Sequence, residues 1–415
     1  MADGSTTLTI RQWKLAFIIA GLALLDAGGM DSSKPEYRPD LVLDLRQFGY
    51  EKPDKFREQA EYQALQNSIV FVDNDTLALS LFVRNPHPGF SVRNKLSGGS
   101  YLFQTVFLDA GSGRILHSQT WSNATIGCGL FPANNGTFVI ERGLELSLHG
   151  PDGTLLKSLS LSPKDFPRTP SLKQSPSGNT LFAFQSDRTG DHVLRIRTSD
   201  LQLLGWLDFA GYFSGAGSDS YFAFVRAVPG SPPSKSDWGG PPMQLFMHRF
   251  DAEDAAHAEP DLIHTTPTPG CTSVVFLDNE TLGLSGMCHE FLILNKAGTI
   301  LYQQRFEREM TSPMLPCRSC DLVAFGTYVL RGGSSWSDTF PKAKGRSIIL
   351  FNRRTRQVLE LPYTMSTGNL SSSKASKALS PNGCLLALQS DSRIEVFRTC
   401  NLPIGAGVQS MRIGP

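Results

Sequence analysis

The sequence has almost no net charge. Its 39 basic and 38 acidic residues leave a formal charge of +1 over 415 residues. Such a balance creates no field that would draw nucleic acid or an anionic membrane to the chain, so neither is expected as a partner. One basic cluster, Arg353-Arg354-Thr355-Arg356, lies at a predicted turn. We interpret it as a solvated turn rather than a phosphate site.

The motifs of common enzymes and metal sites are also missing. Ser214 lacks the glycine two residues before it that a Gly-x-Ser-x-Gly nucleophile elbow requires. There is no Gly-x-x-x-x-Gly-Lys phosphate loop and no His-Glu-x-x-His pair, and the eight histidines are scattered. Asp73-Asn74-Asp75 has the composition of a calcium-loop fragment, but it returns as Asp278-Asn279-Glu280, which indicates turns. We predict no cofactor and no metal.

Long apolar runs are scarce. The run at 15–25 has eleven residues, too few to cross about 30 Å of hydrocarbon comfortably. Arg11 and Lys14 precede it and small residues follow at 27–29, which is the order of a secretory signal peptide. We therefore expect residues 1–29 to be a signal peptide, the mature protein to be secreted or periplasmic, and no stable membrane span to remain. An uncleaved anchor is the alternative.

Only seven cysteines are present, and six of them form pairs that are symmetric about predicted turns. Opposed residues of antiparallel strands have the Cα separation that a disulfide accepts. Cys128 is left over. A structural zinc site at the Cys-x-x-Cys pair would need a second such pair, and a thioredoxin-like redox motif would need a βαβ context; both are missing. The predicted bridges, which agree with export, are Cys271–Cys288, Cys317–Cys320 and Cys384–Cys400.

Helical periodicity is nearly absent after the N-terminus, apart from a short stretch near 54–66, whereas a hairpin motif recurs. Residues 71–80 return, barely altered, as 276–285, and 175–186 return as 380–390. A strand, a polar turn and a strand repeated at a distance are typical of a radial or stacked β repeat. The second strand of each hairpin opens at Thr76, Thr137, Thr180, Ser220, Thr281, Asp321 and Cys384.

The shorter intervals between these positions, 40 to 43 residues, match the roughly 40–50 residues of a four-stranded propeller blade. The unit is clearest at 169–209. Seven hairpins predict an all-β, seven-bladed β-propeller of antiparallel blades over 67–400, preceded by an N-terminal segment, 30–66, and followed by a tail, 401–415. Blade seven lacks an outer strand, which the apolar segment 41–46 would supply, closing the ring and removing open sheet edges. Alternatively, residues 408–413 would supply this outer strand.

With these features the chain resembles the WD40-like seven-bladed β-propellers, particularly degenerate secreted bacterial ones. The resemblance covers about 41–400 and rests on the Ser-Pro-x-Gly turn followed by an apolar strand, as at 175–178 and 380–383. The Gly-His and Trp-Asp dipeptides of the family are absent from their usual blade positions. The resemblance therefore implies the fold, and no functional residue carries over from it.

The other three intervals between second-strand starts are longer. Each places its extra residues in the connection between the second and third strands of a blade. These loops, 84–100, 227–244 and 332–345, are far longer than the usual hairpin loop of two to five residues. Because strands alternate in direction, the loops should share one rim. Their aromatic and charged residues are typical of a recognition surface, although the aromatics could instead pack down as plugs. The candidate ligand-binding residues are His87, Phe90, Arg93, Trp238, Trp336 and Asp338.

The sequence therefore favours an exported, monomeric, non-enzymatic binding protein whose partner is a protein, peptide or glycan. A propeller hydrolase or lyase with its site at the central channel is the alternative, which rests on analogy between folds. A structural component of the cell envelope is a third class. A polar channel with a metal or paired carboxylates would favour the enzyme, and a broad aromatic rim would favour the binding protein.

Overall fold

The computed structural model describes residues 37–50, 68–84, 101–121, 128–167, 169–186, 191–209, 214–230, 242–250, 260–265, 273–286, 288–307, 309–331, 342–362, 377–390 and 392–402. No helix within these ranges is both long enough and apolar enough to span a membrane. The predicted helix near 54–66 lies outside them. All of the described strands belong to the unit of the chain that begins at Pro39.

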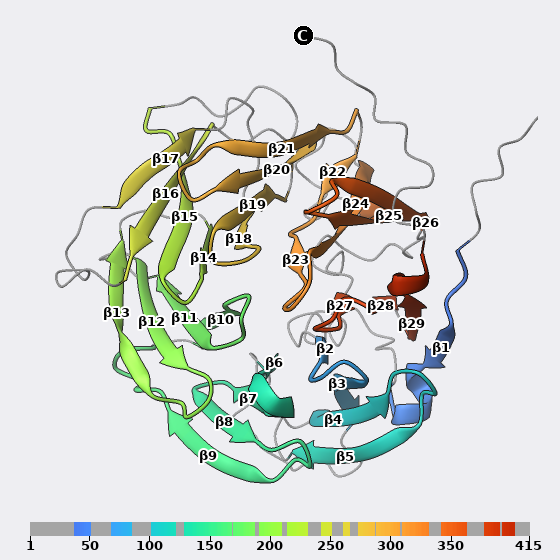
Figure 1. Cartoon of the computed structure of the whole chain (residues 1–415). Helices are drawn as coiled ribbons and strands as arrows, with labels where there is room; N and C mark the ends of the chain where they lie inside the picture. The colour runs from blue at the N-terminus through green and yellow to red at the C-terminus, as the bar shows by residue number, and fades with distance from the viewer. Residues whose placement is uncertain are drawn as a thin grey trace, which may run out of the picture. The chain divides into compact units, whose positions relative to one another are not determined.

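Seven antiparallel sheets stand around a centre as the blades of a ring (Figure 1). Blade 1 contains β2 (Ser68–Phe71), β3 (Thr76–Arg84), β4 (Tyr101–Asp109) and β5 (Ile115–Trp121). Blade 2 contains β6 (Cys128–Pro132), β7 (Phe138–Arg142), β8 (Glu145–His149) and β9 (Leu155–Ser160). Blade 3 contains β10 (Ser171–Gln174), β11 (Thr180–Ser186), β12 (Asp191–Arg197) and β13 (Leu203–Phe209). Blade 4 contains β14 (Ser214–Gly217), β15 (Tyr221–Ala227), β16 (Met243–Arg249) and β17 (Asp261–Thr265).

Blade 5 contains β18 (Ser273–Phe276), β19 (Thr281–Ser285), β20 (Glu290–Asn295) and β21 (Ile300–Arg305). In blade 6 the first strand is split into β22 (Met310–Thr311) and β23 (Leu315–Pro316), followed by β24 (Leu322–Arg331), β25 (Lys342–Asn352) and β26 (Gln357–Pro362). Blade 7 contains β27 (Lys377–Leu379), β28 (Leu385–Ser390), β29 (Arg393–Arg398) and the N-terminal β1 (Leu41–Asp44). The predicted seven-bladed fold is confirmed, and every second strand begins at the predicted residue or one residue later.

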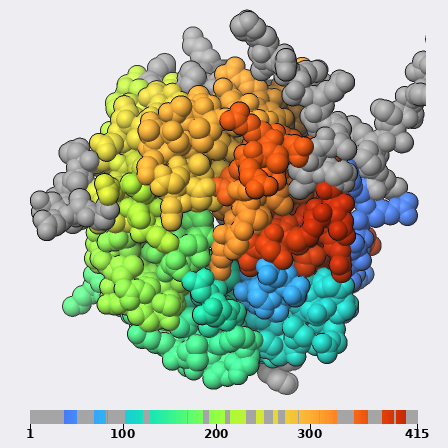
Figure 2. Space-filling view, in the orientation of Figure 1, coloured from blue at the N-terminus to red at the C-terminus, as the bar shows by residue number. Residues whose placement is uncertain are grey.

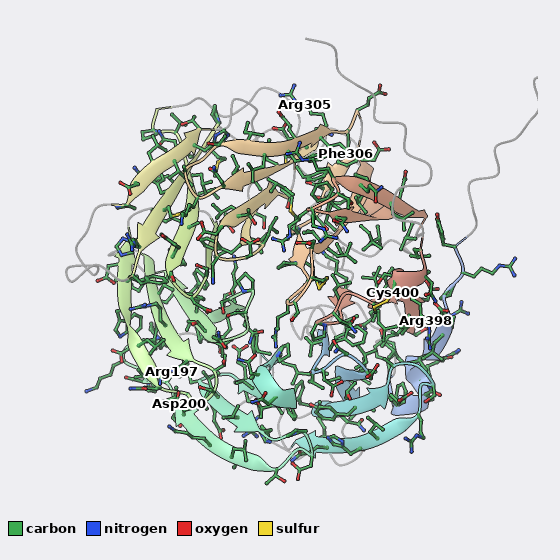
Figure 3. The ribbon with its side chains drawn as sticks, in the orientation of Figure 1. Arg197, Asp200, Arg305, Phe306, Arg398 and Cys400 are labelled. Atoms are coloured by element: carbon green, nitrogen blue, oxygen red, sulfur yellow. A yellow bond between two sulfur atoms is a disulfide. The ribbon has the colours of Figure 1, made fainter. Side chains whose placement is uncertain are left out.

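The N-terminal strand closes the ring, as predicted. β1 pairs antiparallel with β29, and Asp40 N donates to Val396 O at 2.8 Å. β1, blue in Figure 2, lies beside the red strands of blade 7. Figure 3 labels Arg398 and Cys400 at the end of β29, where Arg398 N donates to Asp40 Oδ2 at 2.7 Å. The outer edge of blade 7 is therefore covered.

The closing strand is shorter than predicted. It ends at Asp44, and the 3₁₀ helix η1 (Leu45–Phe48) occupies the rest of the segment 41–46. Asp44 has extended backbone and accepts a hydrogen bond from Arg46 N at 3.0 Å, so its side chain caps the helix. Gly49 ends the helix with a φ of 85°, a conformation that glycine adopts without a steric penalty.

The core consists of apolar layers between neighbouring blades. In one layer Phe182 and Phe184 of β11 pack against Phe222 and Phe224 of β15, as their alternation along the strands predicts. Gly217 of β14 lies directly beneath this layer, and a Cβ atom built there would stand 1.9 Å from Phe182 Cζ. Only glycine therefore allows the two blades to approach this closely.

Two of the predicted disulfides are confirmed. Cys317–Cys320 has a Cα separation of 5.4 Å and Cys384–Cys400 one of 4.7 Å. Cys288 is buried and disulfide-bonded, but Cys271 lies outside the described residues, so that linkage stays a prediction. Cys128 begins β6, and its side chain is also outside the described part.

Candidate functional site

The three loops predicted to bind a partner connect the second and third strands of blades 1, 4 and 6. The connections contain 16, 15 and 10 residues, whereas those of the other four blades contain two to four. The hairpins of blades 1 and 6 are also extended, with nine and ten paired positions. The last described pairs below the loops are Arg84–Tyr101, Ala227–Met243 and Arg331–Lys342.

The ends of these hairpins lie at one face of the ring. Each blade repeats the same antiparallel order from its inner to its outer strand, so all second strands run in the same sense and their ends share a face. The turns between first and second strands lie at the opposite face, which we call the turn face. The predicted site residues His87, Phe90, Arg93, Trp238, Trp336 and Asp338 lie outside the described residues.

Side-chain contacts join the strands below two of these loops. In blade 4 the guanidinium of Arg226 stacks over Phe246, with 4.1 Å between its Cζ and the ring centroid. In blade 6 the hydroxyls of Thr327 and Ser347 are buried and hydrogen-bonded at 2.7 Å. These contacts hold the second and third strands of blades 4 and 6 together.

Glu141 of β7 is a buried carboxylate that sequence reasoning missed. Its side chain is 5% exposed, and its Oε1 atom has no hydrogen-bond partner among the described residues. The carboxylate packs over Gly129, where an added Cβ would stand 2.7 Å from Oε2. Burial raises the pKa of Glu141 to about 8. An acidic residue at the end of the apolar run 138–140, facing a glycine, was the signal that could have found it.

Lys377 of β27 is a second group with an altered proton affinity. Its ammonium donates to Ser312 Oγ at 3.3 Å, and burial lowers the pKa of Lys377 to about 8. Glu141 belongs to blade 2 and Lys377 to blade 7. Within the described ranges no three His, Cys, Asp or Glu side chains are grouped so that they could hold a metal ion.

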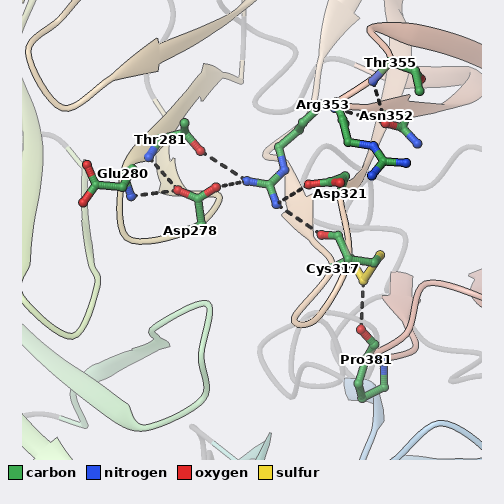
Figure 4. A network of polar contacts seen from close by, with 11 residues as sticks. Asp278, Glu280, Thr281, Cys317, Asp321, Asn352, Arg353, Thr355 and Pro381 are labelled. Carbon is green, nitrogen blue, oxygen red and sulfur yellow. Dashed lines mark hydrogen bonds and ion pairs between the residues drawn. A yellow bond between two sulfur atoms is a disulfide. The ribbon is translucent and has the colours of Figure 1, made fainter.

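Arg353 corrects the interpretation of the basic cluster as a solvated turn. Its side chain is 15% exposed and forms an ion pair and hydrogen bond with Asp278 of blade 5. It also donates to Thr281 Oγ1 at 3.2 Å and to Cys320 O at 3.1 Å (Figure 4). Arg354 and Arg356 are exposed, as predicted. Arg353 therefore ties blades 5 and 6 together, while its neighbours in sequence face solvent.

The electrostatics of Asp278 fit this role. Burial works to raise the pKa of its carboxyl, but hydrogen bonds from Glu280 N and Thr281, together with the Arg353 charge, outweigh burial and lower it. Asp278 Oδ1 accepts from the backbone N–H groups of Glu280 and Thr281 at 2.7 Å each. The Asp-Asn-Glu segment is thus a turn, as predicted. Asp278 in addition forms the ion pair with Arg353 of the neighbouring blade.

Other turns of the turn face join neighbouring blades in the same way. Asn179 of blade 3 accepts from Asn134 of blade 2 at 2.5 Å and donates to Asp219 of blade 4 at 3.1 Å. Asn382 N of blade 7 donates to Asn74 Oδ1 of blade 1 at 3.0 Å. Short polar side chains that suit tight turns therefore also link the blades around the ring.

Comparisons with known proteins find only solved structures that share little sequence with this chain. No protein-family model and no curated protein sequence matches the chain. A chain of the mitotic checkpoint complex is 12% identical, with 89% of this chain and 98% of that chain covered and a TM-score of 0.48. The uncharacterized protein lmo1340 of Listeria monocytogenes EGD-e is 9% identical, with 78% and 88% covered and a TM-score of 0.46. Hsv2 of Kluyveromyces lactis is 10% identical, with 78% and 90% covered and a TM-score of 0.44.

Similarities with such low sequence identities and TM-scores carry no information about partners or activity. The fold is assigned from the sheets of this chain alone. Each of the seven sheets has the same inner-to-outer strand order, and β1 supplies the outer strand of the last one. On this architecture, the chain is a seven-bladed β-propeller closed by its N-terminal strand.

Proposed function

We propose that this protein is an exported, non-enzymatic binding propeller. Its partner, a protein, peptide or glycan, is recognised by the rim that carries the loops 84–100, 227–244 and 332–345. The observation that carries the proposal is the length of the second-to-third connections, 16, 15 and 10 residues in blades 1, 4 and 6 against two to four in the other blades. Loops of such length in a compact domain are commonly functional.

The composition of the loops supports recognition. Tryptophan beside charged residues is enriched at the centres of interfaces, because it buries a large area and offers an N–H donor. Trp238 follows Asp237, and Trp336 precedes Asp338. The paired strands below the loops would hold such residues in place and reduce the entropy lost on binding.

Binding is expected to depend on the two loop tryptophans. Trp238→Ala and Trp336→Ala should each weaken binding by about 1 kcal/mol or more, because each substitution removes an aromatic contact from the interface. Partners captured from the native host on the immobilised full chain would be titrated individually by calorimetry. The melting temperature of both variants should stay close to that of the wild type.

Trp206→Ala is the matched control. Trp206 lies on β13 at the outer circumference, is 36% exposed and stacks on Phe166 with 5.2 Å between centroids. Its loss should leave binding unchanged even where it lowers stability. A sharp drop in melting temperature for both Trp238→Ala and Trp336→Ala would show that these side chains are plugs of the fold, and the proposed rim would be wrong.

Export predicts a processed N-terminus. The mature protein from its native host should begin close to Met30, because signal peptidase cuts after the small residues that follow the apolar run. The disulfides Cys317–Cys320 and Cys384–Cys400 support an oxidising compartment. N-terminal sequencing of the native product tests this, and intact Met1 on a cytoplasmic product would contradict it.

A further inference from the structure

A small disulfide-closed turn lies at the turn face of blade 6. Residues 317–320 lie in the connection between β23 and β24, and the Cys317–Cys320 bridge closes this turn. Cys317 N donates to Leu322 O at 2.8 Å within blade 6, and Ser319 N donates to Pro381 O of blade 7 at 2.9 Å. Figure 4 shows Cys317 next to Pro381. The turn therefore contacts both its own blade and the next.

Arg318, within this turn, contacts blades that are not neighbours of blade 6. Its Nη1 donates to Ala133 O at 3.0 Å and its Nη2 to Pro132 O at 2.8 Å, residues that are 185 and 186 positions away at the end of β6. Blade 6 stands between blades 5 and 7 in the ring, whereas β6 belongs to blade 2. In Figure 1, β23 and β6 face each other across the centre. The Arg318 side chain therefore reaches across the centre of the ring.

Blades 2 and 3 together form the binding site of the Arg318 guanidinium, which we call its seat. Gln174 of blade 3 lies with its Oε1 3.5 Å from Arg318 Nη2, and its own Nε2 donates to Pro132 O at 2.6 Å. Gly178 leaves the space that Arg318 fills, because a Cβ there would stand 2.5 Å from Nη2. Two adjacent carbonyl oxygens match the planar fork of arginine, which a lysine could not engage in the same way.

The disulfide acts locally. A bridge between residues only three positions apart restricts the unfolded chain less than Cys384–Cys400, which closes a separation of 16. Its main effect is to fix the turn from which Arg318 projects. Pro381 O lies 2.9 Å from Cys317 Sγ, so the thiol of a reduced Cys317 could donate a hydrogen bond to this oxygen. Both redox forms of the turn are therefore compatible with the folded blade.

We propose that the turn 317–320 is a redox-sensitive latch. In the oxidised form the disulfide directs Arg318 across the centre of the ring and joins blade 6 to blades 2 and 3. A dithiol reductant supplies two electrons and two protons, so that the S–S bond breaks, two cysteine thiols form, and the reductant becomes a disulfide. The freed turn releases Arg318 from its seat, and the turn face opens at its centre. The latch is independent of the proposed binding rim, since it requires no partner.

Hydrogen exchange of the full chain tests the latch. Reduction with a dithiol should speed amide exchange roughly tenfold in the turns at 133–137 and 175–180, because the charge-assisted hydrogen bonds that hold the seat are lost. Arg318→Ala should show the same fast exchange while still oxidised, and reduction should add nothing further. Arg354→Ala removes an exposed arginine of the same face and should behave as the wild type.

The effect of reducing Cys317–Cys320 must be distinguished from that of reducing Cys384–Cys400. Cys384→Ser/Cys400→Ser, which retains only the latch bridge of the two, should still respond to the dithiol at 133–137 and 175–180. Should Arg318→Ala fail to fold, Arg318→Lys keeps the charge without the fork and should give the same result. The proposal is overturned if mass spectrometry confirms reduction of Cys317–Cys320 while exchange at the seat stays unchanged. It is equally overturned if the Arg318 variant responds to the dithiol as strongly as the wild type.

Discussion

Replacing Leu45 by alanine is expected to lower the free energy of unfolding by about 2–5 kcal/mol, the range for removing a buried leucine side chain. Leu45 follows the ring-closing strand β1 and is fully buried. It belongs to the core that joins blade 7 to blade 1, together with Leu43 and Val396. Losing it both leaves a cavity and loosens β1 from β29. Chemical denaturation followed by tryptophan fluorescence would measure the change.

Val42→Ala is the control on the same strand. Val42 points away from the core and is 51% exposed, so its truncation should change stability by less than about 0.5 kcal/mol. Leu45→Ala should in addition raise the tendency to aggregate, because the edge of β29 becomes available to other chains. Equal effects of the two substitutions would mean that β1 does not close the ring in solution.

Glu141→Gln is expected to remove most of a pH dependence of stability that the wild type shows between about pH 5 and pH 8. Burial raises the pKa of Glu141 from 4.5 to about 8, so the folded protein keeps a proton that the unfolded chain releases. Stability is full below pH 4.5 and falls as the pH rises through this range, with a loss of about 3 kcal/mol at pH 7. Unfolding curves measured at several pH values would show the effect.

Glu141→Gln tests the effect of the carboxylate charge alone, because glutamine has nearly the shape of a protonated glutamate. At pH 5 the variant and the wild type should have similar stability, and at pH 8 the variant should be the more stable. Glu145→Gln is the matched control, since Glu145 is a half-exposed acid at the start of β8, paired with Arg142 at 3.1 Å, and such partly solvated pairs contribute little. An unchanged pH profile in Glu141→Gln would show that the carboxylate is hydrated or neutralised in solution.

Turn chemistry and strand alternation made the fold predictable from the sequence. Polar turns such as 73–75 and 278–280 are fixed by contacts within three residues, for example Asp73 Oδ1 accepting from Thr76 N at 2.7 Å. Because these signals are local and recur, they revealed the number of blades, the starts of the second strands and two disulfides across turns. The missing outer strand of blade 7 also pointed to an N-terminal strand, because an open sheet edge is unfavourable.

The sequence by itself therefore determined the seven blades, the closing strand and the length of the three long loops. Only the tertiary structure decided which polar side chains link the blades. Arg353 meets Asp278 across 75 positions, and Arg318 meets Ala133 across 185. Such contacts depend on how separate blades are rotated and packed against one another, and no local pattern of residues records that arrangement.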